Sequence, residues 1–188
     1  MTLNKCDESS LDICADLLKK EKVLILPTDT VYGFSGIIEK TDSKIRAIKG
    51  RAEEKPFIEL IGKPEDIQKI TDDIIPEKLL SFWPGPLTII VHKKNNPKET
   101  VAVRCPGDEW LRNVIIKTGK PIYSTSVNRS GFPVLLKVSE IKAEFENEVS
   151  LIIDSGDCKK SVPSTIVRIE NRKVIVVRPG EIKITENF

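Results

Sequence analysis

Long hydrophobic runs are missing from this sequence of 188 residues, whose apolar stretches are short and interrupted by Lys, Asp or Pro. A membrane-spanning helix needs about 20 consecutive apolar residues, so none is predicted. The N-terminal stretch, MTLNKCDESS, contains one lysine and no apolar segment and does not resemble a secretory signal. We therefore expect a cytoplasmic protein that makes no membrane contact.

Histidine is almost absent, and the four cysteines are scattered. The single histidine, His92, ends the apolar run LTIIVH and is followed by two lysines. No two cysteines form a CxxC pair, so a zinc site of Cys and His ligands is nearly excluded. A hydrolase with a Ser-His or Cys-His pair would have to use His92, which is more simply interpreted as a solvated strand end. The cysteines are interpreted as small core or surface residues in a reducing compartment.

The two common nucleotide-binding fingerprints are absent as well, because neither GxxxxGK[ST] nor GxGxxG occurs. Thirty basic and 28 acidic residues give a net charge of +2. That balance does not predict a protein that binds nucleic acid over its whole surface, but it is compatible with a local basic cleft. With 39% hydrophobic and 31% charged residues, the chain is predicted to fold, and its length suits one domain over residues 1–188.

Apolar runs typical of strands alternate with helical patterns along the chain. Helices are expected at 9–18, 42–49, 108–117, from Pro64 and at 76–82. Strands are expected at 23–26, 57–61, 87–91, 101–104, 121–124, 151–153, 165–169 and 173–177, the last two as a hairpin. Ser9 and Asp12 resemble a capping box, Asp108 is a predicted N-cap, and 28–36 is expected to be a polar loop. The pattern predicts an α/β fold with a twisted mixed β-sheet and flanking helices.

Four polar clusters stand next to predicted strands, where α/β proteins tend to bind ligands. The first, PTDTVYG at 27–33, offers threonine hydroxyls to a small polar ligand, but it is equally compatible with a plain turn. The second, Lys49-Gly-Arg51 with Lys55, offers cations for phosphates, or it simply complements a helix C-terminus. We expect Lys49 and Arg51 to be exposed, so that replacing them would leave thermal stability almost unchanged.

The third cluster, Ser124-Thr-Ser-Val-Asn-Arg-Ser-Gly131, combines hydroxyls, an amide and a turn. These groups suit phosphate oxygens and ribose, or they form a polar loop with no ligand. The fourth cluster pairs PSTIV at 163–167 with Arg178-Pro-Gly180 across the predicted hairpin. Arg178 is also compatible with a solvated strand end, and each cluster alone is a weak indication.

Together the clusters resemble the YrdC/Sua5 family of threonylcarbamoyl-AMP synthases, in the short bacterial form. The resemblance depends on seven ordered motifs, which are PTDTVYGF, KGR, Trp83-Pro-Gly-Pro-Leu-Thr88, VAVR ending at Arg104, SVN at 126–128, PSTIV and RPG. They run from about Glu21 to Gly180, which is nearly the whole chain. The resemblance implies a single YrdC-like domain whose twisted sheet surrounds a concave basic cleft.

The resemblance also implies roles for individual residues. The threonine-binding residues would be Thr30, Arg104, Ser124 and Ser164. The catalytic cations on the phosphates would be Lys49 and Arg51. The remaining ATP contacts would be Lys55, Thr100, Ser126, Asn128 and Arg178, with Arg51 counted among them. The chain departs from the family pattern after SGFP, where Val134, Leu135 and Leu136 replace small or hydroxyl residues.

The implied reaction joins L-threonine, bicarbonate and ATP into threonylcarbamoyl-AMP and pyrophosphate. A downstream threonylcarbamoyl transferase would then use the product to modify tRNA. Mg²⁺ is expected to arrive with ATP, because the motifs contain no cluster of acidic residues. No covalent nucleophile is required, so catalysis would depend on positioning and charge stabilisation.

Two alternatives stay open at this point. In the first, a non-catalytic YrdC/YciO-like paralogue would use the same basic cleft to bind the phosphates of RNA. In the second, a paralogue would bind nucleotide but form another acyl adenylate. A requirement for threonine and bicarbonate in pyrophosphate release would distinguish both from the synthase.

Overall fold

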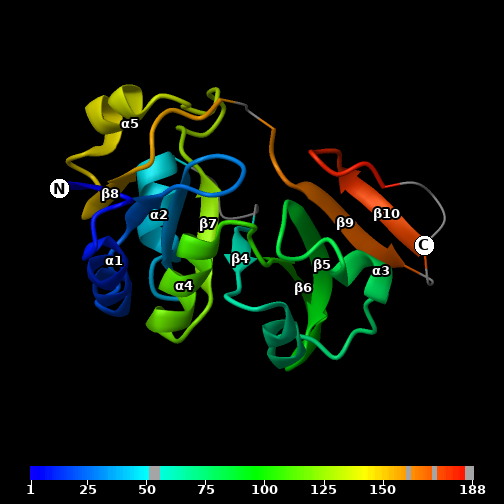
Figure 1. Cartoon of the computed structure of the whole chain (residues 1–188). Coiled ribbons are helices and arrows are strands. Elements are labelled where there is room, and N and C mark those ends of the chain that lie inside the picture. The colour runs from blue at the N-terminus through cyan, green and yellow to red at the C-terminus, as the bar shows by residue number, and fades with distance from the viewer. Residues whose placement is uncertain (51–55, 160–161, 171–172, 185–188) are drawn as a thin grey trace.

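The computed structural model describes residues 1–50, 56–159, 162–170 and 173–184, which build one ten-stranded sheet with helices around it (Figure 1). The strands are β1 (Thr2–Asn4), β2 (Leu24–Leu26), β3 (Gly33–Ile37), β4 (Ile58–Leu60), β5 (Leu87–Lys93), β6 (Asn96–Arg104), β7 (Ile122–Ser126), β8 (Leu151–Asp154), β9 (Thr165–Glu170) and β10 (Lys173–Arg178). The helices are α1 (Ser10–Lys19), α2 (Asp42–Lys49), α3 (Glu77–Leu80), α4 (Glu109–Thr118), α5 (Val138–Phe145) and the 3-10 helix η1 (Pro64–Lys69).

The order of strands across the sheet is β1-β8-β2-β3-β7-β4-β6-β5-β9-β10. Neighbours are parallel in four pairs that include β4 with β6 and β5 with β9, and antiparallel in the others. The predicted α/β class and mixed sheet are therefore confirmed. None of the described helices is long and apolar enough to cross a membrane.

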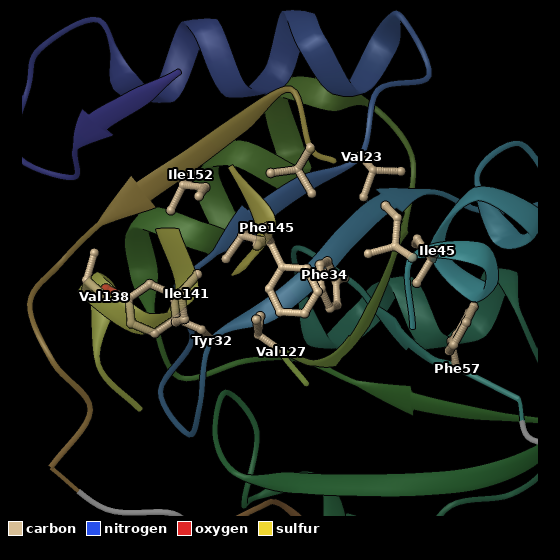
Figure 2. Close-up of a cluster of buried hydrophobic side chains, with 13 residues drawn as sticks. Val23, Tyr32, Phe34, Ile45, Phe57, Val127, Val138, Ile141, Phe145 and Ile152 are labelled. Atoms are coloured by element: carbon tan, nitrogen blue, oxygen red, sulfur yellow. The ribbon is translucent and has the colours of Figure 1, made fainter. Parts of the chain in front are cut away.

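Helices pack on both faces of the part of the sheet that contains β8, β2 and β3. Alternation along β2 sends Leu24 and Leu26 toward α1 and α4, whereas Ile25 packs with residues of α2 and α5. On the second face, the ring of Phe34 on β3 lies 4.9 Å from that of Phe145 on α5 in an edge-to-face contact (Figure 2). Burial on both faces explains why β2 is a continuous apolar run rather than an alternating one.

The part of the sheet that contains β6, β5 and β9 places alternate residues in different surroundings. Val103 on β6 and Ile89 on β5 are fully buried in the cluster that includes residues of η1 and α3. Ala102 and Ile90, one residue away on each strand, instead line a cavity on the other face. The same alternation puts Arg104 on the cavity face, two residues beyond Ala102.

Most of the elements predicted from the sequence are present. α2 has the predicted bounds, α4 begins after Asp108, and the hairpin of β9 and β10 forms as predicted. The Asp108 side chain accepts a hydrogen bond of 3.0 Å from the backbone N–H of Leu111, so the predicted N-cap of α4 is confirmed.

Three predictions about local structure need correction. The capping box is wrong, because Ser9 makes no side-chain cap hydrogen bond at the start of α1. The polar loop at 28–36 is wrong in its second half, because β3 begins at Gly33 and lies buried between β2 and β7. β1 and α5 were not predicted at all. β3 has the sequence GFSGI, and its small residues hid a strand whose burial comes from its neighbours.

Candidate functional site

The candidate site is a cavity of about 420 Å³ on one face of the sheet. Its lining includes residues of β3 and β10, which are six strand-to-strand steps apart in the sheet order. In a flat sheet six steps would span about 29 Å, so the sheet must curl for both strands to border one cavity. The charged side chains among the described lining residues are Arg104 and Arg178. The expectation of a concave basic cleft therefore agrees with the structure.

The cavity begins where α4 stops covering the sheet. Leu60 on β4 pairs with Ile122 on β7, and both pack in the cluster that contains residues of α4. Two residues further along the same ladder, Ile58 pairs with Ser124, and both line the cavity. The register of two neighbouring strands therefore brings Ser124, a predicted threonine contact, to the cavity wall.

The turn after β2 presents Thr30 to the cavity. The hydroxyl of Thr28 accepts hydrogen bonds from the backbone N–H groups of Thr30 and Val31, at 3.0 and 3.2 Å, and donates to the carbonyl of Val31 at 2.8 Å. This network fixes the turn, so the plain-turn interpretation of PTDTVYG is correct for Thr28. The hydroxyl of Thr30 lies 3.0 Å from that of Thr28, and both residues line the cavity.

Arg104, at the end of β6, is the most deeply buried cation of the cavity wall, with 4% of its surface exposed. Its Nε donates a hydrogen bond of 3.1 Å to the carbonyl of Gly85, and its Nη1 donates one of 3.1 Å to the hydroxyl of Thr30. Its Nη2 is paired with the carboxylate of Asp29. A guanidinium group held in one plane by neighbours on several sides is suited to binding a carboxylate or phosphate with two parallel hydrogen bonds.

Ser164 and Arg178 meet at the cavity wall, where the PSTIV and RPG motifs come together. Nη2 of Arg178 donates to the carbonyl of Ser164 at 2.8 Å and to its hydroxyl at 3.1 Å. The same hydroxyl lies 2.8 Å from that of Thr88. A side chain at Gly180 would meet the carbonyl of Pro163 at 2.4 Å, so only glycine allows this close approach of the two motifs.

A bulge in β10 turns Arg178 toward the cavity. Val176 is paired with Val167, a fully buried core residue of β9, whereas Arg178 is paired with the cavity-lining Ile166. The extra residue, Val177, breaks the alternation, so that Arg178 faces the side opposite to Val176. Burial lowers the pKa of Arg178, and the nearby charge of Arg104 lowers it further. The guanidinium groups of Arg104 and Arg178 therefore belong to the same cavity wall and lie near enough for one charge to affect the other.

Lys49 is buried, so the expectation that it is exposed is wrong. Only 2% of its surface is accessible, and its Nζ lies beneath the loop that follows β7. Nζ donates to the backbone carbonyl of Ser126, to the carbonyl of Asn128 at 2.9 Å and to the Asn128 side-chain oxygen at 3.0 Å. The SVN motif and the lysine of KGR are thus joined into one network, and the lysine positions the loop rather than extending into solvent.

Asn128 uses its side chain within the same loop. Its amide nitrogen donates to the carbonyls of Arg129 and Phe132, at 2.9 and 2.8 Å, while its side-chain oxygen accepts from the Ser126 hydroxyl at 2.8 Å. Ser126, the last residue of β7, lines the cavity, whereas Asn128 is not among the lining residues. Of this hydrogen-bond network, Ser126 is therefore the member that reaches the cavity wall.

Besides Asn128, three predicted ATP contacts are not among the described residues that line the cavity. Thr100 lies on β6 in a separate small hollow with Glu59, Lys93 and Tyr123. Arg51 and Lys55 lie outside the described residues. The roles predicted for these three residues therefore stay predictions.

Sequence reasoning missed three residues at the site. Asp29 lies within PTDTVYG, between two threonines, but the motif predicts no ion pair for it, and in the structure it pairs with Arg104. Thr88 contacts Ser164, and its place at the end of the WPGPLT motif was an available signal. Val177 lines the cavity beside Arg178, at a bulge that no local sequence pattern indicated.

His92 and the cysteines do not form a nucleophilic site within the described part of the chain. The His92 side chain is half exposed at the far end of β5, with its Nδ1 3.1 Å from a carboxylate oxygen of Asp73. Cys14 and Cys105 are buried, and burial raises the pKa of each thiol to about 12. Such thiols stay protonated at neutral pH and are poor nucleophiles. Among the described residues, no group of three or more His, Cys, Asp or Glu side chains could hold a metal ion.

The fold and the cavity define a class of α/β proteins in which a curled sheet borders one cavity lined by a buried guanidinium group, a half-buried one and a set of hydroxyls. The family model named Sua5_yciO_yrdC, described as telomere recombination, matches residues 16–180. The chain therefore belongs to the Sua5/YciO/YrdC family. The resemblance inferred from the motifs is confirmed.

Several relatives cover most of this chain. A protein of Methanocaldococcus jannaschii is 37% identical over 182 residues, which are 90% of this chain and 86% of that protein. The threonylcarbamoyl-AMP synthase of Pseudoalteromonas translucida is 30% identical over 89% of this chain and 97% of its own length. That of Bacillus subtilis is 32% identical over 89% of this chain, but the match spans only 52% of the longer protein.

Solved structures share the fold. Pyrococcus abyssi Sua5 complexed with L-threonine superposes with a TM-score of 0.87 and 28% identity, covering 96% of this chain and 57% of that one. Escherichia coli YciO superposes with a TM-score of 0.82 at 22% identity, over 96% and 93% of the two chains. The second likeness concerns the fold alone.

Proposed function

We propose that this chain is an L-threonylcarbamoyl-AMP synthase, which makes threonylcarbamoyl-AMP and pyrophosphate from L-threonine, bicarbonate and ATP. The observation that carries the proposal is the meeting of Arg104, Arg178 and the hydroxyls of Thr30, Ser124 and Ser164 in one cavity. These are the groups that would bind an amino acid next to a phosphate chain. The names of the relatives and the threonine-bound relative support the same activity.

Threonine would lie toward Arg104. The guanidinium group would bind the carboxylate, and the hydroxyls of Thr30 and Ser164 are placed to bond the polar groups of a small amino acid. A buried site of this kind rejects analogues that leave its polar groups without partners. Valine, which lacks the hydroxyl, is therefore expected to be a poorer substrate than threonine.

ATP would lie toward Arg178 and the loop after β7. Ser126 supplies a hydroxyl at the cavity wall, and Asn128 with Lys49 holds the loop in place. Arg51, Lys55 and Thr100 complete the proposed set of nucleotide contacts. The lining of the cavity also includes the apolar residues Val134 and Val177, which would help to exclude water from the reacting groups.

The chemistry in this proposal needs no covalent enzyme intermediate. The amine of threonine adds to CO₂ derived from bicarbonate and loses a proton, which gives a carbamate. An oxygen of the carbamate attacks the α-phosphorus of ATP, the bond to the β-phosphate oxygen breaks, and pyrophosphate leaves. Arg178 would offset negative charge that develops during transfer.

Mg²⁺ would enter on the triphosphate. The described side chains that line the cavity carry hydroxyl and guanidinium groups, and no carboxylate is among them. Hydroxyl and guanidinium groups suit the phosphate oxygens of a nucleotide that carries its own Mg²⁺. A Mg²⁺ site held by the protein would usually include a carboxylate ligand. The product would then pass to a threonylcarbamoyl transferase that modifies tRNA, and a cytoplasmic location stays a prediction.

The proposal is tested by measuring pyrophosphate release with ATP, L-threonine and bicarbonate, omitting each in turn. We expect release only when all three are present. Release that is indifferent to threonine or bicarbonate would contradict the synthase and favour a paralogue with another acyl substrate. RNA binding that weakens steeply with salt, without ATP turnover, would favour the RNA-binding alternative.

Replacing Thr30 tests the threonine end of the cavity. Thr30→Val removes the hydroxyl that accepts from Arg104 but keeps nearly the same volume. We expect the Kd for L-threonine to rise about 10-fold, the effect of losing one buried hydrogen-bond partner, and the Kd for ATP to stay within about 2-fold. Calorimetric titration of both ligands measures this, with Thr30→Ser as the control that restores the hydroxyl. A weaker ATP affinity with unchanged threonine affinity would place Thr30 in the nucleotide half.

A further inference from the structure

Asp29 is the one acidic side chain that the structure joins to the described cavity cations, and the proposed function gives it no role. One carboxylate oxygen pairs with Nη2 of Arg104, and the other accepts a hydrogen bond of 2.9 Å from the backbone N–H of Gly107. Its side chain is 19% exposed, whereas that of Arg104 is 5% exposed. Both of its oxygens are therefore committed to fixed neighbours.

Gly107 is suited to this contact because it lacks a side chain. A Cβ at this position would meet the Asp29 carboxylate oxygen at 2.9 Å. The carboxylate is thus held from one side by the backbone that follows β6 and on the other by the guanidinium group at the end of β6. This arrangement fixes the orientation of the carboxylate, not only its charge.

The WPGP turn holds Arg104 from another direction. The carbonyl of Gly85 accepts from Nε of Arg104, and the N–H of Gly85 donates to the carbonyl of Cys105 at 2.9 Å. The indole N–H of Trp83 donates to the carbonyl of Leu87 at 2.6 Å and fastens the same turn. Two motifs, PTDT and WPGP, therefore contact a single guanidinium group.

Not all N–H donors of the Arg104 guanidinium group are used by protein acceptors among the described residues. The group has five N–H donors, and Gly85, Thr30 and Asp29 accept three of them, one from each nitrogen. Within the part of the chain that the structure describes, the other two, one on each terminal nitrogen, have no protein partner. Since Arg104 is almost wholly buried and lines the cavity, these two donors are the ones available to a ligand.

We propose that Asp29 is a positioning residue that holds the guanidinium group of Arg104 with two N–H groups available to the cavity, and so sets the affinity for the carboxylate of the amino-acid substrate. This inference rests on the proposed function, in which Arg104 binds that carboxylate. Asp29 also offsets the charge of Arg104, which is close enough to Arg178 to lower the pKa of that residue. In this role Asp29 acts through Arg104 and contacts none of the three substrates.

The test begins with wild-type protein, by calorimetric titration of L-threonine and by pyrophosphate release. Asp29→Asn keeps the size of the side chain but removes its charge and one of its two acceptor oxygens. We expect the Kd for L-threonine to rise about 30-fold, as when one partner of a buried charge pair is lost. The KM for ATP should change less than about 3-fold, because distant, independent sites respond nearly separately.

A matched control is Asp108→Asn. Asp108 also pairs with a cation, Lys5, and also accepts a backbone N–H, from Leu111. It does not line the cavity, so its replacement should leave the threonine Kd unchanged. A second comparison places Asp29→Asn in an Arg104→Lys background, where it should raise the threonine Kd less than about 3-fold, because residues that act through each other are not additive.

Several results would overturn the proposal. The first is an unchanged threonine Kd in Asp29→Asn. The second is an equally large rise in the threonine Kd when Asp29→Asn is placed in the Arg104→Lys background. The third is the disappearance of an inflection from the pH profile of kcat in Asp29→Asn, which would make Asp29 a proton acceptor. If Asp29→Asn does not fold, Gly107→Ala displaces the carboxylate while keeping it, and an unchanged threonine Kd there overturns the proposal equally. If the wild-type protein does not bind threonine and releases pyrophosphate without it, the proposed function itself fails. If the wild-type protein binds threonine and requires it for pyrophosphate release, the results for the variants test only the role of Asp29.

Discussion

Arg178→Ala is expected to lower the rate of pyrophosphate release about 100- to 1,000-fold, the effect of removing one preorganised charge from a transition state. The guanidinium group is half-buried beside Ser164, and the β10 bulge directs it to the cavity. It is therefore fixed before substrate arrives and loses little entropy when charge develops on the phosphates. Single-turnover measurement of pyrophosphate release separates this effect from product release.

The hairpin offers a matched control. Arg168, on β9, is half exposed and pairs with Glu170 at 3.2 Å rather than with a cavity residue. Arg168→Ala should leave the rate within about 2-fold and the melting temperature within a few degrees, as for most surface substitutions. If Arg178→Ala turned over ATP at the wild-type rate, Arg178 would be a structural link between the RPG and PSTIV motifs and not a catalytic group.

Lys49→Met should lower the free energy of unfolding by about 3 kcal/mol, because it leaves buried oxygens without the cation that they surround. The acceptors of Nζ are the carbonyls of Ser126 and Asn128 and the side-chain oxygen of Asn128. Methionine keeps an unbranched side chain that is one atom shorter, and it removes the charge and the donors. Urea unfolding followed by fluorescence of Trp83 and Trp110 measures the change.

Lys44→Met on the same helix is the control for Lys49→Met. Its Nζ donates to the carbonyl of Glu21 at 3.2 Å on the surface, so its loss should cost less than about 0.5 kcal/mol. We also expect Lys49→Met to lower activity per folded molecule, because Ser126 at the end of β7 and the loop that follows it would lose their support. Unchanged stability together with lost activity would mean that Lys49 contacts the phosphates directly, as the family resemblance alone implied.

The sequence was sufficient for the elements whose signals are local. α2 and α4 each have an apolar face, an acidic residue in the first turn and a glycine directly after the last turn. These signals all lie within the helix or next to it, and both helices were predicted with nearly correct bounds. β2 and β8 were recognisable because they are buried on both faces and are apolar throughout. The motif order was also sufficient to identify the family, since motif order does not depend on where each side chain points.

The tertiary structure decided what depends on distant neighbours. Thr30, Arg104, Ser164 and Arg178 lie far apart in the sequence, and only the curl of the sheet brings them into one cavity. Lys49 carries the local pattern of a helix C-terminal cation, which predicts exposure, yet the loop after β7 folds over it and supplies its acceptors. Local sequence fixes which residues can form a helix or strand, because those preferences act over a few residues. Burial, pairing and the direction of a charged group depend on the strand order and on a bulge of one residue, and these exist only in the folded chain.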